Sequence, residues 1–220
     1  LKSMGVGWLV SMSAVGSLRE SIRPGDFIVV DQYIDRTKGR RDTFFGQGCV
    51  AHVSFGDPVC STLSGLALGA SKAVGGGETH AGGVYVCIEG PAFSTRAESE
   101  MYRGLGADVV GMTNLPEARL AREAQMAYAT IALATDYDCW HEGEADVTVE
   151  AVLETVRGNV EKAQRVIRAV VPLIGSLPPS STWCALEVAV MTQAGQAPEA
   201  ATKRLALFLE DREFHGKETS

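Results

Sequence analysis

The sequence has 220 residues, of which 45% are hydrophobic, and its formal net charge at pH 7 is −7. This length and composition predict one α/β domain with a single sizeable core. Lysine and arginine are scattered rather than gathered into a basic stripe, which disfavours nucleic acid as a partner. No apolar run reaches about 18 residues and no signal-peptide pattern is seen, so neither a membrane partner nor secretion is expected.

The five cysteines indicate reduced thiols in a cytoplasmic protein. Their number is odd and no Cys-x-x-Cys pair occurs, which argues against a disulfide framework and against a zinc site. Cys87 lies within an apolar run and is expected to be buried. The residues before the first apolar run resemble the last turn of a helix, and we expect an N-terminal portion to precede them.

The first half of the chain predicts two strands and one helix, because short apolar runs alternate with turn residues. The segments are, in order, a strand at 7–13, a small-residue turn at 13–17, a strand at 27–31, an irregular stretch at 31–56, a helix at 60–68 and a linker-like stretch at 69–83 that contains three consecutive glycines.

The second half alternates strands with helices more clearly. Thr95 and Glu98 form a capping-box pattern, and the apolar positions after Val149 recur at helical spacing. The expected elements are a strand at 84–88, a helix at 96–103, a strand at 107–112, a helix opened by Pro116, a strand at 127–135, a helix from 149 to about 172–175, and shorter helices at 185–193 and 203–210. This alternation predicts an α/β fold with a mainly parallel sheet as the default.

Three predicted strand ends carry residues suited to a ligand, and ligands bind at such edges of open α/β sheets. These pairs are Ser13-Ala14, Met112-Thr113 and Thr135-Asp136. Hydroxyls and backbone N–H groups there suit an anion, although ordinary turn chemistry explains the same residues.

Two carboxylates, Asp136 and Asp138, follow the apolar run at 127–135. Such a pair can accept hydrogen bonds from an amine, give a proton to a leaving group, or hold a metal; alternatively, one acid caps a turn and the other is solvated. A metal site would also need His141, Glu142 and Glu144, whose spacing matches no zinc pattern, so we expect no metal.

Several other residues allow both a structural and a functional interpretation. His52 lies in an apolar context, which is typical of a hydrogen-bonded structural histidine. Phe93 and Ser94 precede a helix, where an aromatic ring either packs in the core or stacks on a planar ligand. Trp140 carries the same ambiguity, and packing is favoured.

Taken together, several segments resemble the 5′-methylthioadenosine phosphorylases of the trimeric purine nucleoside phosphorylase family. The resemblance runs from about Leu1 to Gly175, and the order of the segments makes it specific. The matching segments are 13–18, 24–26, 31–37, 89–91, 93–98, 112–113 with 116–117, and 134–140.

The resemblance implies a pentosyltransferase that cleaves 5′-methylthioadenosine with phosphate to adenine and 5-methylthioribose 1-phosphate, in purine and methionine salvage. It implies a mixed sheet that forms a distorted barrel flanked by helices, which replaces the plain parallel sheet. Residues 1–220 would form one nucleoside phosphorylase domain that lacks its N-terminal part. A homotrimer, no cofactor besides the co-substrate phosphate, and a location in the cytoplasm, with the nucleus as a further compartment, are also implied.

The resemblance also assigns roles to the matching residues. Phosphate contacts are Ser13, Ala14 and Thr113; the ribose contact is Met112; base-side contacts are Phe93, Ser94 and Val149; the purine-reading acids are Asp136 and Asp138; and His52 is donated across the trimer interface to the 5′ substituent.

Asp136 is expected to share a proton with N7 of the leaving purine, with its pKa raised by burial beside Asp138. A carboxylate accepts from a 6-amino group and repels a 6-oxo group, so the pair predicts a preference for 6-aminopurines. The alternatives are a 6-oxopurine nucleoside or methylthioinosine phosphorylase, a non-catalytic nucleoside-binding subunit and, less favoured, a nucleoside hydrolase. The family's glycine-rich phosphate loop and Arg-His pair would lie upstream of Leu1, so little turnover is expected of these residues alone.

Overall fold

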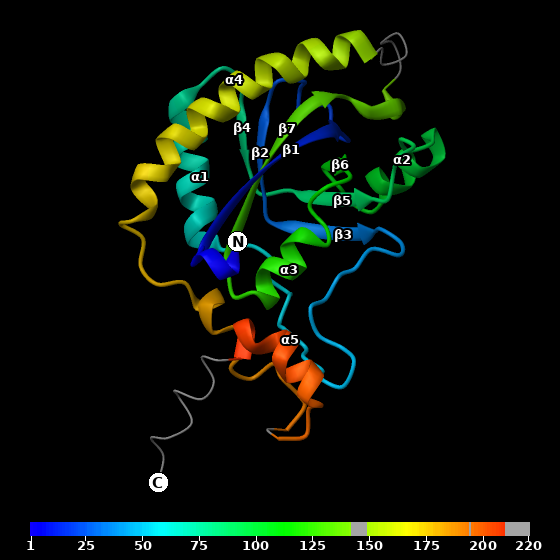
Figure 1. Cartoon of the computed structure of the whole chain (residues 1–220). Helices are drawn as coiled ribbons and strands as arrows, with labels where there is room; N and C mark the ends of the chain where they lie inside the picture. Colours follow the sequence, from blue (N-terminus) through cyan, green and yellow to red (C-terminus); the bar gives the residue numbers. More distant parts are fainter. Residues whose placement is uncertain (142–148, 194, 210–220) are drawn as a thin grey trace.

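The computed structural model describes residues 1–141, 149–193 and 195–209, with the backbone alone for 149–154. A mixed, seven-stranded sheet forms the centre of the molecule, and helices flank it (Figure 1). The strands are β1 (Trp8–Ser17), β2 (Phe27–Val30), β3 (Gln32–Arg36), β4 (Thr79–Ala81), β5 (Val84–Ile88), β6 (Val109–Gly111) and β7 (Ala127–Asp136). The helices are α1 (Ser61–Val74), α2 (Arg96–Gly104), α3 (Glu117–Glu123), α4 (Val149–Ile174) and α5 (Glu199–Leu209), with 3₁₀ turns η1 (Lys2–Met4), η2 (Asp138–Trp140) and η3 (Ser181–Cys184).

The sheet order is β3-β5-β6-β1-β7-β2-β4. Four of its neighbouring pairs are parallel, and two, β1 with β6 and β2 with β7, are antiparallel. The prediction of a mixed sheet flanked by helices is therefore confirmed, and the mainly parallel default is replaced.

The sheet is distorted because two of its strands bend sharply. β2 continues into β3 through Asp31, and β4 continues into β5 through Gly82 and Gly83. The two bent strands run in parallel with one register throughout, from Phe27 beside Thr79 to Arg36 beside Ile88. They carry the chain from one edge of the sheet to the other, which gives a distorted barrel. Within the described residues no ladder joins β3 to β4, so the barrel is not closed by hydrogen bonds.

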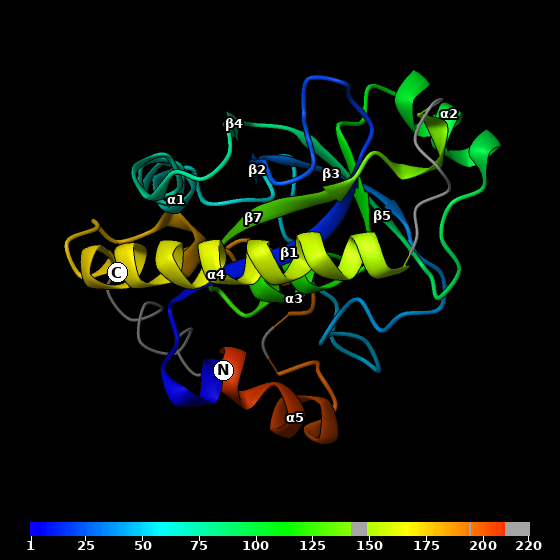
Figure 2. The same cartoon turned by 90° about the horizontal axis from the view of Figure 1, so that it is seen from above.

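The centre of the sheet is the parallel pair of β1 and β7. The strand β7 is rich in alanine and contains β-branched residues. Nine of its ten residues are buried, as expected for a strand covered on both faces. On one face α1 and α4 pack against each other and against β2 and β7, in a cluster around Ile131 and Val166. α3 covers the other face of β7. Figure 2 shows α4 lying along the sheet beside β7 and β1.

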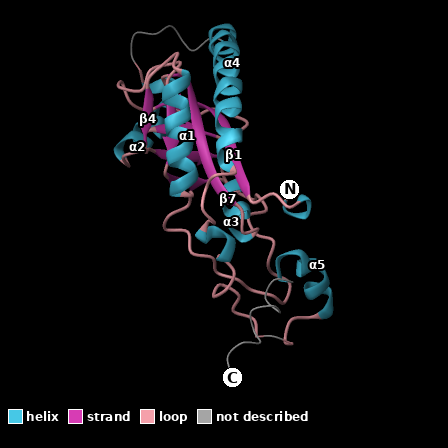
Figure 3. Cartoon of the chain, turned by 90° about the vertical axis from the view of Figure 1, so that its left-hand side faces the viewer, coloured by secondary structure: helices cyan, strands magenta, loops and turns pink. Residues whose placement is uncertain are grey.

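The C-terminal helix α5 lies beyond the end of the sheet at which β1 and β7 begin (Figure 3). Its buried residues Leu205 and Phe208 join the main core, and Phe208 stacks on Phe44 with ring centroids 4.8 Å apart. None of the helices in the described part of the chain is both long and apolar enough to cross a membrane.

Several sequence predictions of local structure are corrected. The turn predicted at 13–17 is strand, because these residues pair with β7 and β6. The stretch at 31–56 contains β3, and the linker-like stretch at 69–83 contains the end of α1 and all of β4. The helix predicted at 185–193 is absent, and η3 precedes that segment instead. The long helix, by contrast, ends at Ile174 within the predicted limits, after passing through Pro172.

Candidate functional site

Two predicted phosphate contacts, Ser13 and Thr113, meet in a cluster of hydroxyls. Ser13 lies on β1 with 2% of its surface exposed, and Thr113 is the second residue after β6. The Oγ of Ser13 lies 2.8 Å from the Oγ1 of Thr113 and 3.0 Å from the hydroxyl of Tyr85 on β5. Thr113 is exposed, so the cluster reaches the protein surface.

The Tyr85 hydroxyl reaches Ser13 because Gly111 leaves room for it. A Cβ at Gly111 would lie 2.1 Å from that hydroxyl oxygen and 3.1 Å from a methyl of Val15. Burial raises the pKa of Tyr85, so it remains a neutral donor and acceptor. Asn114, the residue after Thr113, donates from Nδ2 to the hydroxyl of Tyr128 on β7 at 3.0 Å.

The predicted ribose contact Met112 is held at its backbone by a half-buried arginine, Arg40. Arg40 donates to the carbonyl oxygens of Met112 and Leu115 at 2.7 Å each and to that of Glu89 at 2.7 Å. It also pairs with the Glu89 carboxylate at 3.3 Å. Arg40 therefore joins the segment that follows β5 to the segment that follows β6, and the second segment carries Met112 and Thr113.

The predicted acids lie at the end of β7, beside the end of β1. Asp136 pairs with Gly16 across a register shift that leaves Thr135 as an extra residue on β7. Such a bulge changes the direction of the side chains that follow it. A Cβ at Gly16 would lie 3.1 Å from Asp136 Oδ1 and 3.2 Å from Asp138 Cβ, so the glycine admits both acids.

The two acids have different surroundings. Both oxygens of Asp136 accept hydrogen bonds, Oδ1 from the backbone N–H of Asp138 at 2.8 Å and Oδ2 from the Thr135 hydroxyl at 2.6 Å. Asp138 opens η2 in the left-handed region, with φ of 52°, and its Oδ2 is buried with no hydrogen-bond partner in the described part of the chain. Burial raises the pKa of Asp138, and the charge of Asp136 adds to this rise. The structure thus shows one carboxyl with both oxygens engaged and a second with a free, buried oxygen.

Of the two residues predicted to contact the base before α2, the structure places Ser94 beside η2 and leaves Phe93 exposed. Ser94 is half-buried, and its carbonyl accepts from the Cys139 thiol at 3.3 Å, which places it beside η2. Trp140 is 6% exposed and donates from Nε1 to the Ser17 carbonyl at 2.8 Å, so the packing role favoured for it is confirmed. Phe93 is 83% exposed, so its ring faces solvent in this structure.

Other predicted residues lie outside this cluster or outside the described side chains. Ala14 is exposed on β1, next to Ser13. Val149 begins α4, and its side chain lies outside the described residues, as do Glu142 and Glu144 of the metal alternative. His52 is exposed, and its backbone N–H donates to the Ala189 carbonyl at 2.8 Å.

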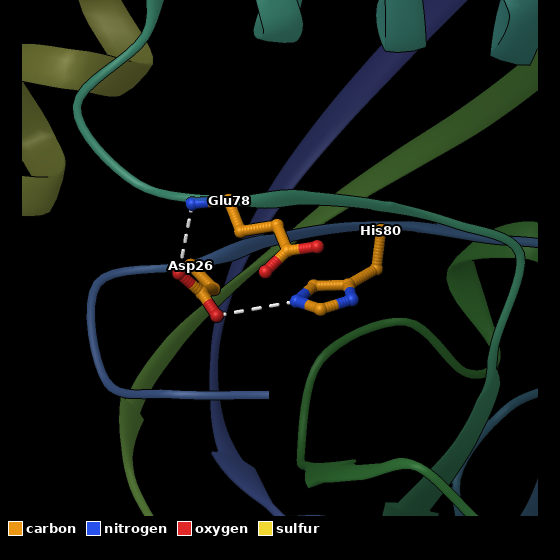
Figure 4. A group of neighbouring side chains, drawn as sticks. All are labelled: Asp26, Glu78 and His80. Atoms are coloured by element: carbon orange, nitrogen blue, oxygen red, sulfur yellow. Dashed lines mark hydrogen bonds and ion pairs between the residues drawn. The ribbon is translucent and has the colours of Figure 1, made fainter. Parts of the chain in front are cut away.

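A second cluster of titratable side chains lies at the turn before β2. Asp26, Glu78 and His80 bring one potential ligand atom each to within 4.8 Å of one another (Figure 4). The Asp26 oxygens are already engaged: Oδ1 accepts from the Glu78 N–H at 2.9 Å, Oδ2 accepts from the Arg23 N–H at 2.8 Å, and His80 Nε2 lies 3.1 Å from Oδ2. These contacts make the cluster a link between the turn before β2 and strand β4.

The five cysteines are all unpaired, and Cys49, Cys60 and Cys87 are buried. This agrees with the prediction of free thiols and of a buried Cys87. Burial raises the pKa of Cys87, which makes it an inert core residue rather than a nucleophile.

Comparison with known proteins identifies the family to which this site belongs. A model of the phosphorylase superfamily matches residues 1–172. The S-methyl-5′-thioadenosine phosphorylases of Gloeobacter violaceus and Geobacter sulfurreducens are 52% and 49% identical over 95% of this chain, which covers 71% and 73% of their lengths. The chain belongs to the methylthioadenosine phosphorylase family.

Solved structures agree with this assignment. A methylthioadenosine phosphorylase from an Antarctic soil metagenomic library superposes with a TM-score of 0.91 at 48% identity, over 95% of this chain and 74% of the other. The methylthioadenosine phosphorylase of Schistosoma mansoni in complex with adenine gives 0.77 at 33% identity, over 96% and 74%. The distorted mixed sheet is therefore the fold of this family.

Three residues that contact the predicted site residues or lie near them were not predicted from the sequence: Tyr85, Arg40 and Ser99. Tyr85 lies within an apolar run that predicts only a buried strand. Arg40 lies in a stretch that reads as irregular, and its four-carbonyl contact depends on segments more than 45 residues away. Ser99, which is fully buried in α2, carries no sequence signal beyond its place after a capping box.

Proposed function

We propose that this protein cleaves 5′-methylthioadenosine with phosphate, giving adenine and 5-methylthioribose 1-phosphate. The observation that carries the proposal is a hydroxyl cluster around Ser13 of β1 and a carboxyl pair that begins at the end of the neighbouring strand β7, in a family whose bacterial relatives are named S-methyl-5′-thioadenosine phosphorylases. The hydroxyls suit an anion, and the carboxyls suit a purine with hydrogen-bond donors.

The phosphate side of the reaction is assigned to Ser13, Ala14 and Thr113. The Ser13 and Thr113 hydroxyls, 2.8 Å apart, would donate to one phosphate, and the Ala14 N–H would add a backbone donor. Phosphate attacks C1′ while the bond from C1′ to N9 breaks, so the sugar carbon passes through an oxocarbenium-like state. Phosphate is a co-substrate here, and no further cofactor enters the proposed chemistry.

The base side is assigned to Asp136 and Asp138. The base leaves with its electron pair, and a proton shared with N7 neutralises the charge that develops on the ring. Asp136 is the proposed partner of N7, and Asp138 is proposed to fix the amino edge. Burial raises the pKa of Asp138, and its Oδ2 has no hydrogen-bond partner among the described residues, so this carboxyl is easier to protonate than a solvated one.

Asn substitutions at the two acids test this function. Asp136→Asn is expected to lower kcat/KM for methylthioadenosine by about 10²-fold or more, because the proton partner is lost. It should also raise cleavage of inosine relative to methylthioadenosine, since an amide placed at N7 can also donate to the adjacent 6-oxo group. The measurement is phosphate-dependent release of the base, with Asp138→Asn assayed in parallel.

Glu199→Gln, an exposed position on α5, is the matched control and should behave as wild type. Full activity of Asp136→Asn on methylthioadenosine would contradict the assignment. A wild-type preference for inosine would instead favour a 6-oxopurine nucleoside phosphorylase. Release of adenine without phosphate would favour a hydrolase. Ligand binding without release of the base would favour a nucleoside-binding subunit.

We further propose that the protein acts as a homotrimer in which His52 approaches a neighbouring site. The segment of His52 pairs with residues 189–191, and exposed apolar side chains surround it: Val50 is 44% exposed, Met191 57% and Val188 86%. Exposed apolar side chains on two paired segments are in keeping with a protein–protein contact.

The proposal treats residues 1–220 as one nucleoside phosphorylase domain, and the match covers 71% of the length of the Gloeobacter violaceus relative. A cytoplasmic location accompanies it, in keeping with five unpaired cysteines and bacterial relatives. The nuclear location expected from the resemblance is not supported by these relatives, because they are bacterial proteins.

A further inference from the structure

The helix α2 packs against η2 and brings a buried serine beside the acid pair. Ser99 is 0% exposed, and its Oγ has no hydrogen-bond partner among the described residues. The buried Oδ2 of Asp138, the first residue of η2, also has no hydrogen-bond partner among the described residues. Two buried polar atoms without partners are costly, and their proximity offers a partner to each of them.

The position of Ser99 is set by the start of α2. The Thr95 side chain accepts from the Glu98 N–H, the Glu98 carboxylate accepts from the Thr95 N–H, and the Ser99 N–H donates to the Thr95 carbonyl. On the other side, the guanidinium of Arg103 lies 3.6 Å above the ring of Trp140 and so holds η2 against α2. The helix α2 thus contacts η2, and the Ser99 side chain lies close enough to Asp138 to affect the pKa of this carboxyl.

The Ser99 hydroxyl opposes the electrostatic effect of burial on Asp138. Burial raises the pKa of Asp138, the adjacent charge of Asp136 raises it further, and the Ser99 hydroxyl lowers it. Among the described residues, the titratable groups that interact with Asp138 are Asp136 on β7, Cys139 on η2 and Tyr102 on α2. None of these is a cation, so the ionised carboxylate depends on neutral donors, which are the Ser99 hydroxyl and the backbone N–H of Cys139.

We propose that Ser99 is a positioning residue that donates to Asp138 Oδ2 and fixes this carboxyl toward the amino edge of a bound 6-aminopurine. The inference rests on the proposed function for its kinetic consequence, but its structural part concerns the free protein. Small rotations of the two side chains complete the hydrogen bond, and Asp138 then presents its other oxygen to the base in one orientation.

Ser99→Ala tests the proposal, since alanine is compatible with a buried helical position. The carboxyl ¹³C resonance of Asp138, identified by its loss in Asp138→Asn, reports the ionisation of this group in the free protein. Removing a donor to the ionised form is expected to move the titration midpoint upward by about 0.5–1 pH unit. Ser71→Ala is the matched control, because Ser71 is also 0% exposed in a helix, with an Oγ that has no partner among the described residues.

In turnover, Ser99→Ala is expected to lower kcat/KM for methylthioadenosine about tenfold, by analogy with the loss of one hydrogen bond to a charged group. The KM for phosphate should not change, and the limb of the pH–rate profile that belongs to Asp138 should move upward with the NMR midpoint. Ser99→Thr, which keeps the hydroxyl, should restore the midpoint.

An Asp138 midpoint in Ser99→Ala equal to that of wild type and of Ser71→Ala would overturn the inference. Failure of the proposed function has a different signature: wild type would release no adenine in the presence of phosphate, and the shift of the Asp138 midpoint would still be measurable in Ser99→Ala.

Discussion

The two halves of the proposed site differ at the level of single residues. Ser13, Tyr85 and Thr113 supply neutral hydroxyls within 3.0 Å of Ser13 Oγ, whereas Asp136 and Asp138 supply acceptors. Neutral donors suit an anion, and acceptors suit a base that carries an amino group. Both halves depend on a glycine, because a side chain at Gly111 or Gly16 would meet Tyr85 or the acids.

The hydroxyl cluster leads to a prediction for Ser13→Ala. The variant should raise the KM for phosphate about tenfold and leave the KM for methylthioadenosine nearly unchanged, because one donor to an anion is lost. Initial rates at varied phosphate concentration measure this. Ser64→Ala on α1, away from the cluster, should leave both constants unchanged, and an unaltered phosphate KM in Ser13→Ala would contradict the assignment.

At the level of elements, the site depends on how the segments after β5 and β6 are held together. Arg40 accomplishes this from a segment with no regular structure, by donating to the carbonyls of Ile88, Glu89, Met112 and Leu115. A planar guanidinium can bond to several carbonyls at once, whereas a lysine ammonium has fewer donors in a less fixed geometry.

Arg40→Ala is therefore expected to lower the free energy of unfolding by about 1–3 kcal/mol, because half-buried carbonyls lose their donors. Arg40→Lys should restore only part of it. Urea unfolding followed by circular dichroism gives the values. Arg41→Ala, at the exposed neighbouring position, is the matched control and should lie within about 0.5 kcal/mol of wild type. Equal stability of the two alanine variants would show that Arg40 does not tie the segments together.

At the level of the whole molecule, the bent strands place the two arms of the sheet around one site. β2 and β3 are consecutive in the chain but lie near opposite ends of the strand order. β4 and β5 are also consecutive, and they lie beside β2 and β3 respectively. The bends at Asp31 and at Gly82 and Gly83 are stabilised locally, since Asp31 Oδ1 accepts from the Gly83 N–H at 3.1 Å. The distorted barrel follows from these bends.

The exposed apolar side chains around His52 give a prediction for assembly. Val188→Glu should weaken the proposed trimer, because a charge would be buried in the subunit contact, and should raise the KM for methylthioadenosine through the loss of His52. Light scattering gives the mass, and the assay gives the KM. Val160→Glu, at a position 47% exposed on α4, is the control. A wild-type protein that is monomeric but fully active would contradict the trimer.

Local patterns in the sequence predicted the elements with strong periodicity. The strands at 84–88 and 127–135, the helix at 149–175 and the capping box at Thr95 agree with the structure within one residue. The small residues at 13–17 were wrongly assigned to a turn, because pairing with β7 and β6 outweighs the local preference of serine and glycine for turns. β3 was missed because its mixed polar residues are ordered by β5.

By itself, the sequence determined the α/β class, the order of the main elements and, through the resemblance of separate motifs, the family. Only the tertiary structure decided that Ser13 and Thr113 share one hydroxyl cluster with Tyr85. It also decided that Asp138 is not a solvated turn residue, because its Oδ2 is buried and has no hydrogen-bond partner among the described residues. The physical reason is that periodicity records which residues are buried within one element. Hydrogen bonds and pKa shifts depend instead on residues from other elements, 72 or 100 positions away along the chain, which only the folded sheet brings together.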